Sequence, residues 1–108
     1  MKKDYIGTWR IKEMELWDED YIDMEGPGQI KIGKNGIGSL RFGAVEAELD
    51  CKTDHIGEEE RMEFTFEGSD EGDTCSGRGW MKINGSEMNG RIYFHLGDDS
   101  GFKTVKTK

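Results

Sequence analysis

The sequence predicts an all-β fold, an eight-stranded antiparallel up-and-down (meander) β-barrel. The apolar residues of the 108-residue chain recur in short alternating runs between glycine-rich and acidic turns. That pattern is typical of strands with one face in water. No stretch of ten or more residues carries the apolar stripe of an amphipathic helix. Eight strands joined by short turns are expected to close into a barrel, because closure removes the exposed sheet edges.

The chain is expected to be one domain, residues 1–108, because its length suits a single hydrophobic core. The connection over 18–27 is the longest, and one helical turn is expected within it. We expect strands over residues 5–17, 28–33, 37–42, 45–53, 60–67, 75–83, 86–96 and 101–106.

The first strand changes its apolar face halfway along. In the stretch GTWRIKEMELW, Trp9 and Ile11 fall on one face and Met14 and Leu16 on the other. A bulge near residues 12–13 would bend the strand and switch its inward face. The alternative is that Met14 and Leu16 lie outside, under a loop.

Turn residues set the expected registers of two hairpins. Gly43-Ala44 suits a type II′ turn that pairs Phe42 with Val45. Around Asn35-Gly36 a two-residue turn would place apolar residues opposite polar ones. A three-residue loop, which we expect to set Ile32 against Leu40, keeps the apolar residues on one face.

A third turn sets the register that matters most for function. Asn84-Gly85 as the central pair of a type I′ turn would set Met81 against Met88 on the inward face. The same register sets Arg78 against Arg91 on the outward face. Two opposed guanidinium groups repel unless an anion lies between them. That anion is a carboxylate of the neighbouring strand, such as that of Glu63 or Glu67, a carboxylate of a second subunit, or a bound anionic ligand.

Aromatic residues share the outward face with the two arginines. Trp80, Tyr93 and His95 alternate in phase with Arg78 and Arg91. Aromatic and arginine side chains are enriched where proteins contact each other. This face therefore favours an interaction module, either a homodimer or a module bound to a basic partner.

Three glycines are expected to share the inward face of the same two strands: Gly77, Gly79 and Gly90. Their missing side chains leave either a small apolar cavity or room for a large residue from the opposite wall, with Trp9 as the expected occupant. An eight-stranded barrel encloses enough space for side chains or for one small ligand. These residues carry the first functional hypothesis, a barrel that binds a small apolar or cationic molecule.

Carboxylates are expected to gather at one end of the barrel, because alternate loops of a meander fall at the same end. Such an end would attract cations, basic peptides or a hard metal ion, or would simply be solvated. The ten residues are Asp18, Glu19, Asp20, Asp23, Glu25, Asp70, Glu71, Asp73, Asp98 and Asp99, with no lysine or arginine in the same loops.

Charge and chemistry exclude several classes. A net charge of −8 argues against nucleic acid and anionic membrane surfaces as partners. Two cysteines without an export signal favour reduced thiols in a cytoplasm. No metal-ligand spacing or nucleophile–base pair stands out, so no metal, cofactor or catalytic residue is predicted. An enzyme would need a lone titratable group inside the barrel.

Gly7-Thr8-Trp9, at the start of the first strand, resembles the Gly-x-Trp motif of the lipocalin and avidin groups of ligand-binding barrels. In those groups the tryptophan closes one end of the barrel, which implies an eight-stranded barrel with a ligand inside. The stretch GRGWMKINGSEMNGRIYFHLGDDSGF, residues 77–102, also resembles small uncharacterised prokaryotic proteins. That second resemblance implies no activity.

Overall fold

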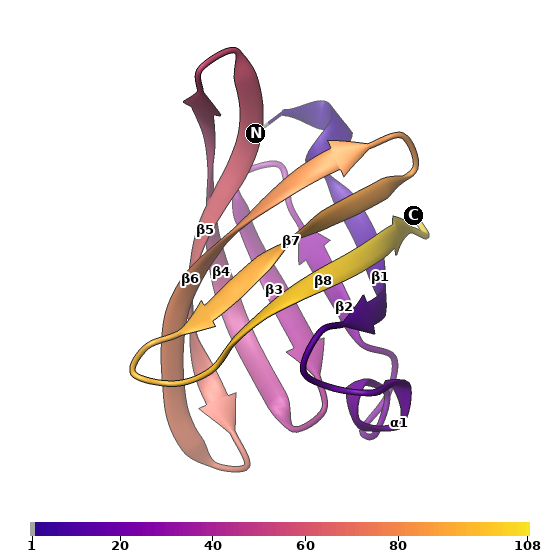
Figure 1. Ribbon diagram of the computed structural model, residues 1–108, viewed down its shortest axis with the longest axis vertical. Coiled ribbons are helices and arrows are strands. Elements are labelled where there is room, and N and C mark those ends of the chain that lie inside the picture. The colour runs from indigo at the N-terminus through magenta and orange to yellow at the C-terminus, as the bar shows by residue number, and fades with distance from the viewer. Residues whose placement is uncertain (1) are drawn as a thin grey trace.

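The computed structural model describes residues 2–108 and confirms a closed, antiparallel, up-and-down barrel of eight strands in the order β1 to β8 (Figure 1). A 3-10 helix, η1, spans Lys3–Tyr5, and the expected helical turn is present as α1, Glu19–Ile22. The strands are β1 (Gly7–Met14), β2 (Gln29–Ile32), β3 (Ile37–Phe42), β4 (Val45–Ile56), β5 (Glu59–Asp70), β6 (Asp73–Asn84), β7 (Glu87–Phe94) and β8 (Asp99–Lys106).

Three strands in the middle of the sequence, β4 to β6, are longer than the apolar pattern indicates. β4, β5 and β6 each have 12 residues, and in Figure 1 their hairpins project beyond the shorter strands at both ends. The ladder between β4 and β5 continues to the pair Ile56–Glu59. Backbone hydrogen bonds extend a two-stranded ribbon past the core, where no side chain has to be buried and the apolar alternation ends.

The predicted bulge in β1 is confirmed. The register against β8 shifts between Ile11 and Glu13, and Met14 is buried after the shift. Leu16 lies beyond the end of the strand and is 50% exposed, so the inward switch reaches Met14 only. Trp9 is 1% exposed, and its indole N–H donates a hydrogen bond to the Tyr5 carbonyl at 3.0 Å.

In the β2–β3 and β3–β4 hairpins the apolar residues lie on the expected inward face, but the register of the β2–β3 hairpin differs from the predicted one. Phe42 pairs with Val45 across the Gly43-Ala44 turn, as predicted. The loop at 34–36 has the expected three residues, and Gly36 adopts a φ of 82° there. The predicted pair Ile32–Leu40 is wrong, since Ile32 pairs with Gly38 instead.

The predicted register of the β6–β7 hairpin is also wrong by two residues. Asn84 pairs with Glu87, so Gly85-Ser86 forms the turn, with a φ of 67° at Gly85 as a type II′ turn requires. The physical reason for the observed register is the size of the paired side chains. The expected register set Gly79 against Gly90, whereas the observed one sets each glycine against a large residue, as in Gly79–Ile92 and Met81–Gly90.

The barrel interior is filled. Phe64 and Phe66 of β5 pair with Gly79 and Gly77 of β6, and their rings are the side chains nearest to both glycines, in place of the expected Trp9. The residual interior space is about 10 Å³, which is room for about one water molecule. Between the two alternatives for the glycine patch, the structure therefore has the filled core.

Candidate functional site

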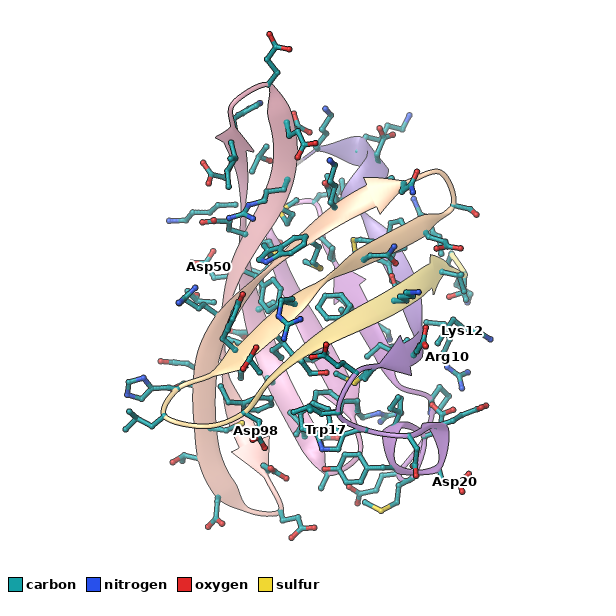
Figure 2. The ribbon with its side chains drawn as sticks, viewed as in Figure 1. Arg10, Lys12, Trp17, Asp20, Asp50 and Asp98 are labelled. Atoms are coloured by element: carbon teal, nitrogen blue, oxygen red, sulfur yellow. The ribbon has the colours of Figure 1, made fainter. Side chains whose placement is uncertain are left out.

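A large hollow lies on the outside of the barrel. It has a volume of about 900 Å³ and runs over the outward faces of β4, β5, β6 and the end of β7. We call it the outer groove. Figure 2 shows Asp50, one of its lining residues, on the outer side of the long strands. The groove is lined by Glu48, Asp50, Thr65, Phe66, Glu67, Ser76, Gly77, Arg78, Tyr93, Phe94, His95 and Leu96.

A second hollow of about 380 Å³ adjoins the outer groove. The two share Asp50, Thr65, Arg78 and Tyr93. The second hollow adds Trp80, so the aromatic side chains predicted for an interaction face lie along one continuous depression.

The predicted opposition of Arg78 and Arg91 is wrong, because the hairpin register differs by two residues. Arg78 pairs with Tyr93, and Arg91 pairs with Trp80. The Arg78 guanidinium lies over the Tyr93 ring, with its carbon 4.8 Å from the ring centroid. A cation over an aromatic face is attracted by the ring quadrupole. The two arginines therefore have different surroundings.

Arg91 is held by carboxylates of this chain, although not by those of β5. Its Nη2 donates to Asp99 Oδ2 at 2.6 Å and to Glu15 Oε1 at 3.0 Å. These bonds, that to Asp99 first, raise the pKa of Arg91 further above its ordinary value. Arg91 thus ties the end of β1 to the start of β8, and we assign it a structural role.

Arg78 has no such partner. None of the ion pairs formed within residues 2–108 includes its guanidinium, and its side chain is exposed in the outer groove. The nearby cation–π pair of Arg61 and Trp80, at 5.2 Å, differs because Arg61 also binds Glu63 at 3.0 Å. Arg78 is therefore available to a ligand.

His95 lies past the end of β7, at the turn to β8. Its imidazole is exposed, while its backbone N–H donates to the Ser76 carbonyl at 2.7 Å. Leu96 follows at the rim of the groove with a φ of 57° and 95% of its surface exposed. The side chains of His95 and Leu96 therefore both lie at the edge of the outer groove.

Three carboxylates form the opposite wall of the groove. Glu48 of β4 pairs directly with Glu67 of β5, and Asp50 pairs with Thr65. The sequence predicted Glu67 as a possible partner of the two arginines, whereas Glu48 and Asp50 were not predicted to join it, because acidic clusters were expected in the loops. The signal was present, since Glu48 and Asp50 alternate with buried Ala47 and Leu49.

The predicted acidic end of the barrel is present, and two of its residues are paired with arginines. Figure 2 shows Asp20 and Asp98 at the same end, together with Trp17. Asp23 accepts hydrogen bonds from the Gly28 N–H at 2.8 Å and from Arg10 at 2.6 Å. These contacts, that from the Gly28 N–H first, lower the pKa of Asp23.

Aromatic packing closes this end of the barrel beneath the carboxylates. The Trp17 ring lies 5.1 Å from Phe42 and 6.2 Å from both Tyr21 and Phe94, measured between centroids. Within residues 2–108, no three His, Cys, Asp or Glu side chains converge as a metal-binding set. The acidic residues are therefore spread around a closed end.

Both cysteines are free, as expected. Cys51 lies in the middle of β4, and its burial raises the pKa of the thiol to about 12. Cys75 is half-buried, and desolvation also raises its pKa. Neither environment activates a thiolate.

Comparison with known families, with curated proteins and with solved structures found no match to this chain. Among the residues that the structure describes, neither helix has the length and apolar character of a membrane span.

Proposed function

We propose that this barrel is a binding module that holds a partner in the outer groove and the hollow that adjoins it, against Arg78, Tyr93 and Trp80. One observation carries the proposal. A hollow of about 900 Å³, large enough for a ligand, lies outside the barrel, while about 10 Å³ remains inside. Ligand sites occupy hollows of about 300–1,000 Å³.

The composition of the groove supports the same function. Tryptophan, tyrosine and arginine dominate the energy of protein contacts, because they combine a large contact area with directional polar groups. Trp80 and Tyr93 are both half-buried, so each keeps an accessible ring edge on a well-supported base. Arg78 adds a cation that no carboxylate within residues 2–108 pairs with.

The hypothesis of a small apolar or cationic ligand inside the barrel is less well supported. Gly7-Thr8-Trp9 resembles the lipocalin and avidin motif, and that resemblance implies an interior site. Phe64 and Phe66 occupy the space next to Gly79 and Gly77 that such a ligand would need. We therefore propose a lipocalin-like barrel whose binding surface is its outer wall. The two free thiols support a cytoplasmic location.

Selection from a random dodecapeptide library displayed on phage tests this proposal. The full chain is the target, and enriched peptides are then titrated against the wild type and a double variant, Arg78→Ala with Tyr93→Ala. Loss of two interface anchors is expected to weaken binding by about tenfold or more.

The matched control is Lys34→Ala with Lys31→Ala, which removes exposed side chains of the β2–β3 hairpin, outside the groove lining. This variant should bind like the wild type. Circular dichroism melts of all variants establish that they fold. The proposal fails if no peptide is enriched, or if enriched peptides bind the groove variant as tightly as the wild type.

A further inference from the structure

One wall of the outer groove carries three carboxylates, those of Glu48, Asp50 and Glu67. Glu48 and Glu67 are direct partners in the β4–β5 ladder, and Asp50 is two residues from Glu48 on the same face. None of the three belongs to an ion pair formed within residues 2–108. Like charges directly opposed across a ladder destabilise it. A cation between them would remove that repulsion.

The net charge of the lining is negative. Three carboxylates face one guanidinium, that of Arg78, and the lining also includes the exposed imidazole of His95. The whole chain has a net charge of −8, which extends the same sign of potential beyond the groove. Charge complementarity therefore favours a basic occupant. It disfavours a second copy of this chain, which brings a further −8 and the same concave face.

The aromatic wall suits the apolar part of a basic side chain. Tyr93 lies in the lining, in the same row of the ladders as Asp50, Thr65 and Arg78. Lysine and arginine place their aliphatic stems along apolar surface while the charged end reaches polar groups. Arg78, between the two walls, can donate to a carbonyl or carboxylate of the occupant.

We infer that the occupant of the outer groove is an extended segment of a partner protein carrying a lysine or arginine. The charged end of that side chain lies between Glu48 and Glu67, and a second side chain of the segment lies along Tyr93. The inference rests on the proposed function, and it adds the chemistry of the partner. An open groove of about 900 Å³ holds a few extended residues, with the basic side chain as the specific contact.

Titration with two synthetic decapeptides tests the inference. One alternates serine with lysine, and the other alternates serine with glutamate. Amide resonances of the ¹⁵N-labelled chain are followed at about 0.15 M salt, where the Debye length of about 8 Å limits long-range attraction. The lysine peptide should shift resonances of β4–β7 around the groove and bind at least about fivefold tighter than the glutamate peptide.

A pair of charge-matched variants separates the site from the general field. Glu48→Gln with Glu67→Gln should weaken the lysine peptide about fivefold, because each exposed ion pair contributes modestly. Glu25→Gln with Glu58→Gln makes the same change in net charge at exposed positions outside the groove lining. That control should change the affinity by less than about twofold.

Each other result overturns the inference. Equal weakening by both double variants shows attraction by net charge alone. A preference for the glutamate peptide assigns the groove to an acidic partner through Arg78. Sedimentation of a dimer that Tyr93→Ala dissociates assigns the groove to a second copy. In the library selection, groove-dependent peptides without basic residues overturn only this inference, whereas the absence of any groove-dependent peptide removes the proposed function itself.

Discussion

The inward and outward faces of β4, β5, β6 and β7 are built from alternate residues of the same strands, yet they differ in how well their side chains are matched by neighbours. Inside, the missing side chains of Gly77, Gly79 and Gly90 are matched by large neighbours, as at Gly79 with Phe64 and Ile92. Outside, the cation of Arg78 and the opposed carboxylates of Glu48 and Glu67 have no ionic partner within residues 2–108. The inward face thus packs the core, and we propose that the outward face serves recognition.

The largest expected effect contrasts two tryptophans. Trp9→Ala should lower the free energy of unfolding by about 3–5 kcal/mol, the range for truncating a buried large aromatic residue. Trp80→Ala should cost about 1–2 kcal/mol, because its ring is half-buried and loses mainly the contact with Arg61. Urea denaturation measures the free energy of unfolding of both variants. Similar losses at the two positions would contradict the division between the faces.

The second contrast uses glycines. A Cβ at Gly79 would lie 2.3 Å from the Arg91 carbonyl and 2.4 Å from the Phe64 ring, so Gly79→Ala should destabilise by about 1–3 kcal/mol. At Gly101, on the outward face of β8, the nearest atom would be Arg91 Nη1 at 3.5 Å. Gly101→Ala should therefore be nearly neutral in the same urea titration. A neutral Gly79→Ala would mean that the interior can yield space to a ligand.

The third contrast sharpens the assignment of the arginines. Arg78→Ala loses an exposed cation–π contact and should cost at most about 1 kcal/mol. Arg91→Ala leaves Asp99 and Glu15 without their shared partner and should lower the melting temperature more. The difference in melting temperature between the two variants should become smaller at 1 M salt, because salt screens exposed ion pairs. A larger loss from Arg78→Ala would reassign Arg78 to a structural role.

The smallest expected effect is a difference in how fast the two cysteine thiols react in the folded protein, with no change in stability. With a pKa of about 12, about one Cys51 thiol in three thousand is ionised at pH 8.5. Iodoacetamide should therefore modify half-buried Cys75 of the native protein well before Cys51, and both in urea. Intact-mass and peptide mass spectrometry assign the label. Early modification of Cys51 would show that the barrel opens readily.

Alternation in the sequence determined the fold class, the strand count and the division of residues between two faces. It determined them because a period of two residues is a property of each strand by itself. The bulge in β1 was visible in the same way, as a change of phase between Ile11 and Met14. These features need no knowledge of neighbouring strands.

Register was decided by tertiary packing. A shift of two residues keeps every side chain on its face, so apolar pattern alone cannot distinguish Arg78–Arg91 from Arg78–Tyr93. The observed pairing follows from size, because it sets glycines against large residues. The partners of Arg91 are Glu15, which is 76 positions away along the chain, and Asp99, which is 8 positions away. No local pattern specifies such contacts.

The outer groove is the feature that only the tertiary structure decided. Its carboxylates come from β4 and β5, its cation from β6 and its aromatic wall from the end of β7. Each of these residues, taken alone, is an ordinary outward position on a strand. They form a site because the ladder aligns Glu48 with Glu67 and Arg78 with Tyr93, and because ring packing inside leaves the outer wall as the place with open space.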